Sequence, residues 1–179
     1  MMQLLRNVWR QPSGSVSVEF AVALPVLLVM FLGVFEVSQA LIVYMKVIDV
    51  ADTISDLVAQ QKQVASSDID NYYIAGQLVM TPSAGSGLGL AVASVTFDPS
   101  TGTPSVAWQV TRGGATAMTD AAAAATGLGS DGDSVIVASA TYTYTPISSY
   151  LLKQGITMSS RVFSRPRVVF TIPCTAPCS

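Results

Sequence analysis

An apolar run near the N-terminus most constrains how this chain folds. Residues 20–35 are sixteen consecutive positions without a charge, and a carboxylate stands at each end, Glu19 and Glu36. A membrane-spanning helix needs about 20 apolar residues. The run reaches that length only if it begins near Ser15 or continues past Glu36 toward Met45. It therefore predicts a membrane helix, and the two carboxylates need an explanation.

The composition narrows the functional classes. Hydrophobic residues make up 50% of the 179 positions and charged residues 11%, which is apolar for a soluble domain. Because the apolar excess lies before residue 60, the chain is predicted to be anchored once. The net charge of −2 argues against a nucleic-acid partner, which requires clustered Lys and Arg. The absence of His removes the commonest general base and metal ligand.

The charges that precede the run predict its orientation, and its nature has three interpretations. Arg6 and Arg10 come first with no acid, so the positive-inside rule places the N-terminus in the cytoplasm and the rest outside. One interpretation is a secretory signal cut after the small-x-small triplet 38–40, although Glu36 beside it is unusual. The second is a permanent, uncleaved anchor. The third depends on the residues before the run.

Gly14 is followed by four residues and then by Glu19, just as the apolar run opens. This spacing resembles the type III signal of type IV pilins, in which a prepilin peptidase cuts after the Gly and the apolar helix is retained. The resemblance implies a leader of residues 1–14, cleavage between Gly14 and Ser15, and Glu19 as the fifth mature residue.

Physical chemistry offers two interpretations of Glu19. A new N-terminal ammonium group would lie at the positive end of the helix dipole, and a carboxylate on the first turn offsets both charges. An acid within lipid otherwise costs a few kcal/mol. The pilin resemblance implies that the amine belongs to a neighbouring subunit, so that Glu19 sets the register of assembly. The simpler interpretation is an acid that is favourable at a helix N-terminus.

Three short motifs follow in order: Val-Glu-Phe-Ala at 18–21, Leu-Pro at 24–25 and Gly-Val-Phe-Glu at 33–36. Together they resemble the TadE-like pseudopilins of the tight adherence (Tad) pilus system, over roughly residues 13–60. Members often carry an Arg soon after the second Glu and an Arg-rich helix end. This chain instead has Gln39, Asp52, Asp56 and Gln60, so charge-based contacts there are expected to differ.

The resemblance implies a minor pilin-like subunit that assembles or initiates a pilus. Its expected partners are other pilin and pseudopilin subunits, the prepilin peptidase, the inner-membrane assembly platform and membrane lipid. Glu36 is expected to lie near the outer membrane surface or to pair within an assembly. Pro25 is expected to kink the helix, either as a pilin-like bend or as an ordinary membrane-helix proline.

The helix is predicted to continue beyond the membrane to Gln61, which gives a length of about 70 Å from Ser15. Apolar residues recur there at intervals of three and four, and they are expected to form the face that packs on a head domain: Val37, Leu41, Tyr44, Ile48, Ala51, Ile54, Leu57 and Val58.

Residues 62–179 are predicted to form a β-rich periplasmic head. Strands are expected at 88–97, 105–110, 134–145 and 156–172, the last interrupted at Pro166, and the first two form a hairpin. Thr119 either caps a short Ala-rich helix that ends at Gly127 or begins a flexible loop. Residues 147–155 form a connection or helical turn. The fold class is therefore α+β, an antiparallel sheet of about four strands with the long helix on one face.

Several polar groups of the head are candidates for chemistry. Asp131 and Asp133 stand beside glycines, as in part of a Ca²⁺ site, but without the downstream Glu of an EF-hand they are more typical of a solvated turn. Arg161, Arg165 and Arg167 are expected to share one strand face, as a solvated edge that discourages strand addition or as a partner surface.

The two cysteines, Cys174 and Cys178, predict one small-loop disulfide in an oxidising periplasm. No nucleophile motif is present, so neither an enzymatic activity nor a cofactor is expected. The function predicted is that of a pilin-like subunit. The alternative is a permanently membrane-anchored periplasmic scaffold or binding protein without a role in a filament.

Overall fold

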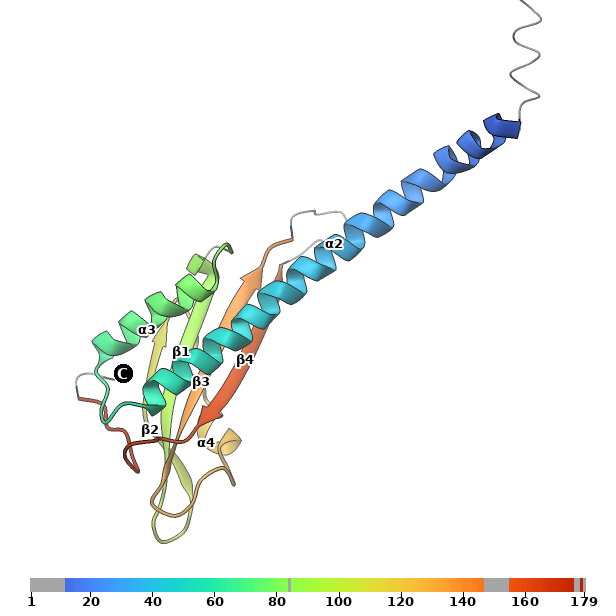
Figure 1. Ribbon diagram of the computed structural model, residues 1–179. Coiled ribbons are helices and arrows are strands. Elements are labelled where there is room, and N and C mark those ends of the chain that lie inside the picture. The colour runs from blue at the N-terminus through green and yellow to red at the C-terminus, as the bar shows by residue number, and fades with distance from the viewer. Residues whose placement is uncertain (1–11, 84, 147–154, 176–177, 179) are drawn as a thin grey trace, which may run out of the picture.

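A computed structural model describes residues 12–83, 85–146, 155–175 and 178. One long helix runs from the N-terminal side into a head built on a sheet (Figure 1). The elements are α2 (Pro12–Ala59), α3 (Ser66–Val79), the short 3-10 helix η1 (Gly85–Gly87), β1 (Leu88–Phe97), β2 (Pro104–Arg112), α4 (Ala121–Ala124), β3 (Ser134–Tyr144) and β4 (Ile156–Ser164). The α+β architecture predicted from the sequence is confirmed. Arg6, Arg10 and residues 147–154 of the predicted connection lie outside the described residues.

The sheet has four strands in the order β2-β1-β3-β4, and each neighbouring pair is antiparallel. β1 and β2 form the predicted hairpin, which turns at Asp98. The Asp98 carboxylate accepts hydrogen bonds from the backbone N–H groups of Ser100 (2.8 Å) and Thr101 (2.9 Å). These bonds stabilise the charged form and hold the pKa of Asp98 below its ordinary value. Asp98 thus fixes the turn that pairs the two strands.

The C-terminal half of α2 and all of α3 cover one face of the sheet (Figure 1). The two helices approach closely at Gly76 of α3. A Cβ added there would lie 3.1 Å from Ile54, 3.2 Å from Val50 and 3.3 Å from Leu88. A larger residue at position 76 would therefore push α3 away from α2 and β1.

The opposite face of the sheet carries a second apolar cluster, which α4 and its flanking loop cover at one end. Its buried members are Ala91, Ala93, Val95, Phe97, Met118, Ala121, Ala125, Val135 and Val137. The central strands β1 and β3 are consequently buried on both faces for much of their length.

The predicted packing face of α2 was wrong over its first half. Ala51, Ile54 and Val58 are buried as expected, but Val37 and Leu41 are 56% and 54% exposed. Tyr44 is also exposed and Ile48 is half-buried. The residues that pack on the sheet are instead Val43, Val47, Val50, Ala51, Ile54 and Val58. Between residues 37 and 48 the helix is apolar on several sides, so spacing alone did not identify the face toward the head.

The predicted bounds of two elements need correction, and one helix was missed. The Ala-rich helix α4 has only four residues, and Asp120, not Thr119, occupies the N-cap position. β4 ends at Ser164 and does not resume after Pro166. α3 was not predicted at all, although Asp68 marks its start by accepting a hydrogen bond from the Ala65 N–H at 2.8 Å.

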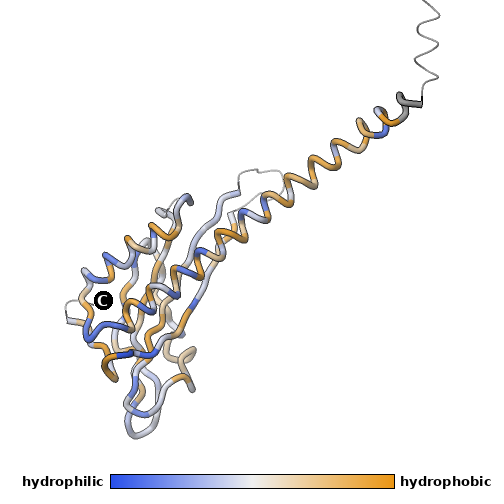
Figure 2. Tube along the Cα trace, in the orientation of Figure 1, coloured by the Kyte–Doolittle hydropathy of each residue, from blue (hydrophilic) through white to orange (hydrophobic). Residues whose placement is uncertain are grey.

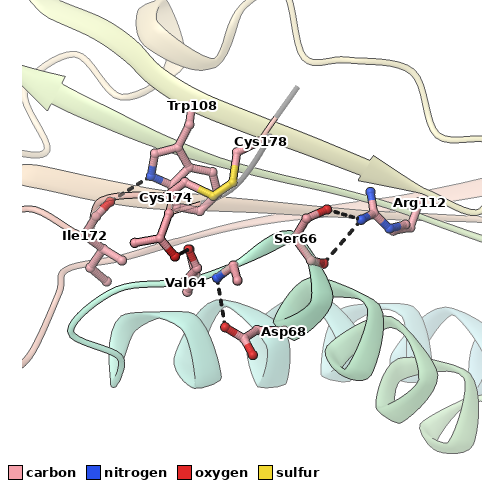
Figure 3. Close-up of a disulfide and its surroundings, with 10 residues drawn as sticks. Val64, Ser66, Asp68, Trp108, Arg112, Ile172, Cys174 and Cys178 are labelled. Atoms are coloured by element: carbon pink, nitrogen blue, oxygen red, sulfur yellow. Dashed lines mark hydrogen bonds between the residues drawn. A yellow bond between two sulfur atoms is a disulfide. The ribbon is translucent and has the colours of Figure 1, made fainter.

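After β4, residues 165–175 form a C-terminal strap across the end of the head. The Arg167 N–H donates to the Ala59 carbonyl at the end of α2 (2.8 Å), and the Trp108 indole N–H of β2 donates to the Ile172 carbonyl (2.7 Å). Val64 pairs with Cys174 in an isolated parallel bridge (Figure 3). The strap thus satisfies a terminal carbonyl of α2 and joins it to the sheet.

The packing face of α2 predicts different effects for two isoleucines of the same helix. Ile54 is fully buried, whereas Ile42 is 48% exposed. We expect Ile54→Ala to lower the free energy of unfolding of the head by about 2–5 kcal/mol, and Ile42→Ala to change it little. Urea denaturation of the full chain in detergent micelles, followed by tryptophan fluorescence, measures both. Equal losses would contradict the assigned face.

Candidate functional site

The N-terminal half of α2 projects from the head and is apolar around its circumference. From Val16 to Phe35 nearly all its large apolar side chains are exposed, and Figure 2 shows this half as a mainly hydrophobic segment outside the head. The stretch from Ser15 to Glu36 measures about 32 Å at 1.5 Å per residue, close to the hydrocarbon thickness of about 30 Å. The helix is long and apolar enough to cross a membrane, and it fits a single-pass anchor.

Glu19 lies on this exposed segment. It belongs to a shallow apolar groove on the helix surface, beside Val18, Val22, Ala23 and Val26. Within the described residues 16–35 it is the one charged side chain. The structure therefore places a carboxylate on a surface otherwise suited to lipid or to another apolar helix.

Gly14 and Ser15, the predicted cleavage residues, lie in the first turn of α2, which begins at Pro12. Proline is favoured at the start of a helix because its missing N–H has no intrahelical acceptor there. Pro25 lies within the same uninterrupted helix, which Figure 1 shows as continuous. Its ring nitrogen cannot donate to the Ala21 carbonyl, so that carbonyl is open to another donor.

Glu36 begins the part of α2 that packs on the head. The residue is 4% exposed, so its side chain is covered by the head. Nearby is Tyr144, the last residue of β3, which is 7% exposed. Burial raises the pKa of Tyr144, and the charge of Glu36 raises it further. The Tyr144 hydroxyl is buried and makes no hydrogen bond among the described residues.

Lys46, on a different face of α2 from Glu36, also joins this helix to the head. The Lys46 ammonium group donates to the carbonyls of Met80 (3.4 Å) and Thr81, which follow α3. A cation is favourable beside the carbonyl groups at a helix C-terminus. The sequence did not reveal this contact, because the two acceptors are backbone carbonyls more than thirty residues away from Lys46.

The three arginines do not share one strand face, which corrects the prediction. Arg161 of β4 forms a bidentate ion pair with Asp120 (2.8 and 3.0 Å). The Arg165 guanidinium donates to the Leu128 carbonyl at 2.7 and 3.1 Å, and Arg167 pairs with Asp56 of α2. Because β4 ends at Ser164, the last two lie on the strap, and each arginine contacts a different segment.

Asp131 and Asp133 lie in the turn before β3, where the Asp133 N–H donates to the Ser130 carbonyl at 3.0 Å. In the part of the chain that the structure describes, no group of three His, Cys, Asp or Glu side chains gathers as metal ligands would. The structure joins Cys174 and Cys178 in a disulfide at the end of the strap (Figure 3).

The comparison with known proteins bears on the exposed helix. Residues 14–55 match the family of TadE-like proteins. The TadE-like match begins at Gly14 and contains Glu19, Pro25 and Glu36, so it confirms the resemblance drawn from the motifs. It ends within α2 and leaves the head outside. No curated protein and no solved structure matches the chain.

The TadE-like family indicates a pilin-like protein related to the Tad pilus, a class that is typically structural. Glu19 and Pro25 lie on one membrane-length segment, and their roles in assembly and in bending the helix stay predictions. The sequence motifs did not reveal that Glu36 and Tyr144 meet. Their proximity depends on which side of α2 faces the sheet, and the local motifs do not encode that choice.

The proximity of Glu36 to Tyr144 predicts how the pKa of Tyr144 changes when the charge at position 36 is removed. In Glu36→Gln the pKa of Tyr144 should fall, because one repulsive charge is gone, yet stay above its ordinary value, because burial is the larger cause. ¹³C NMR of Cζ-labelled tyrosine in micelles measures this, and Tyr144→Phe assigns the signal. An unchanged pKa would contradict the proximity.

Proposed function

We propose that this chain is a minor pilin-like subunit of a Tad-type pilus. A prepilin peptidase removes residues 1–14 by cutting between Gly14 and Ser15. The helix then waits in the inner membrane with its N-terminus cytoplasmic and its head periplasmic, and it is extracted into a filament or its initiating complex. The TadE-like match supports the pilus relation, and Arg6 and Arg10 before the apolar run support the orientation.

The observation that carries this proposal is the position of Glu19. It lies one turn after Ser15, on an apolar segment that the head leaves exposed. A permanent anchor has no evident use for a carboxylate there, because a charge within hydrocarbon costs a few kcal/mol. A subunit that packs its helix against others gains from it, since the carboxylate offsets the new N-terminal ammonium group of a neighbouring helix.

The distance between the cleavage site and the head supports the same proposal. About 32 Å of helix separates Ser15 from Glu36, so a helix cut after Gly14 still spans the bilayer and keeps the head at its surface. The leader would leave without shortening the anchor below membrane length. The subunit's partners are then other pilin and pseudopilin subunits, the assembly platform and lipid.

A permanently anchored periplasmic scaffold or binding protein is the second candidate. The observation that favours it is that contacts within the chain hold the head together. The strap and the ion pairs join α2, β2 and β4 without another chain. This candidate retains residues 1–14 and has no role in a filament. Two experiments separate the candidates.

The first experiment determines the mature N-terminus. Intact-mass and N-terminal peptide mass spectrometry of the membrane fraction, in cells that carry the prepilin peptidase, should find Ser15 as the first residue. Gly14→Val, which places a branched side chain at the cut, should retain the leader. Arg6 and Arg10 still present in the wild-type protein would contradict the proposal and favour the permanent anchor.

The second experiment separates assembly from insertion. We expect Glu19→Ala and the isosteric Glu19→Gln to reduce the amount recovered in sheared pili or in crosslinked pilin complexes at least about tenfold, because the charge is lost in both. Membrane insertion should be unchanged. Val16→Ala, three residues away on the same exposed segment, is the control. Full incorporation of both Glu19 variants would refute a role for this carboxylate.

A further inference from the structure

A hollow on the sheet face opposite α2 has no part in the proposed assembly. It has a volume of about 530 Å³, within the range of about 300–1,000 Å³ typical of small-molecule sites. We name it the hydroxyl hollow, because several hydroxyl-bearing residues of this face line it: Thr116, Thr119, Ser139, Thr141 and Ser159. It is independent of the exposed membrane helix and of the TadE-like match.

The sheet register explains why this end of the face is polar. Ala91 of β1, Ser139 of β3 and Arg161 of β4 are directly opposite one another, and the next row holds Gly89, Thr141 and Ser159. Two residues farther along the strands, in the other direction, the same face holds Ala93, Val137 and Phe163, which pack in the apolar cluster with α4. The hydroxyl rows are therefore the part of the face that α4 does not cover.

The wall of the hollow is held in place by several contacts. The side-chain amide of Gln109 lies against the backbone of Met118, where it donates to the carbonyl at 3.2 Å and accepts from the N–H. Met118 itself is buried among the apolar cluster. The bidentate pair between Asp120 and Arg161 closes the wall onto β4. The hollow is thus preformed, which lowers the entropic cost of binding.

The charges of the hollow select against an ionic ligand. Arg161 and Asp120 are the charged residues of its lining, and they neutralise each other. The guanidinium holds the pKa of the Asp120 carboxyl below its ordinary value, so this carboxylate stays charged near neutral pH. A bound anion or cation would have to compete with this pair, whereas a neutral ligand can donate to the outer lone pairs of the carboxylate.

The remaining groups suit a ligand with several hydroxyls. Each Ser or Thr hydroxyl both donates and accepts, and Thr141 Oγ1, 3.4 Å from its acceptor, the Gly89 carbonyl, keeps its oxygen open as an acceptor. The buried Ala91 and Met118 side chains supply an apolar floor for C–H groups. From this combination we propose that the hydroxyl hollow binds a neutral polyhydroxylated ligand of hexose size, either a free sugar or the terminal unit of a glycan.

The test uses the full chain in lipid nanodiscs, because many mild detergents carry sugar headgroups. Saturation-transfer NMR is recorded with D-glucose, D-galactose and N-acetyl-D-glucosamine, and with their methyl glycosides, which mimic the end of a glycan. D-glucuronate and cyclohexanol are the charged and apolar comparators. We expect at least one neutral sugar to be saturated more strongly than both comparators. A sugar that binds only as its methyl glycoside identifies the glycan end as the source.

Thr141→Val keeps the shape of the side chain and removes its hydroxyl, so we expect sugar affinity to fall about three- to tenfold. The matched control is Thr143→Val, an exposed position on the same strand and face but outside the lining, which should bind as the wild type does. Both variants must retain the wild-type unfolding midpoint. The proposal is overturned if no neutral sugar is saturated, if a comparator is saturated more strongly, or if both variants bind alike.

Discussion

The structure depends on the continuity of α2, which is a membrane-length helix at one end and a core element at the other. Its apolar side chains are exposed all round before Glu36, and from Val43 onward one face is buried under the sheet. No linker separates the two parts. The distance from Ser15 to the head is therefore set by the rise of one continuous helix.

Local patterns predicted several elements correctly, although α3 was missed. β1 was expected at 88–97 and lies there, because an apolar run stands between a glycine-rich loop and the Asp98 turn. The C-terminal strap was mistaken for the end of a strand, because its contacts join backbone groups of distant segments, such as the Arg167 N–H and the Ala59 carbonyl. Hydrogen bonds of this kind produce no periodic pattern in the sequence.

For the candidate site, too, the sequence indicated what depends on local spacing and not what depends on distant contacts. The spacing of Gly14, Glu19, Pro25 and Glu36 is local, and one helix carries all four. The direction in which each side chain points depends on contacts with distant segments. Glu36 is buried because the sheet docks on its side of α2, and that choice follows from Val47, Val50 and Ile54 further along the helix rather than from the residues around Glu36.

The charges of Glu19 and Glu36 consequently lie in different environments. Glu36 lies beneath the head beside Tyr144, so the cost of its charge belongs to the folding of a single subunit. Glu19 lies on the exposed apolar surface, where the cost of its charge arises from lipid and falls when polar or charged groups pack against that surface. A change at Glu36 should therefore alter how firmly the helix and head are joined, whereas a change at Glu19 leaves the head intact and alters what the helix can pack against. The spacing of about 26 Å between them keeps these two roles apart.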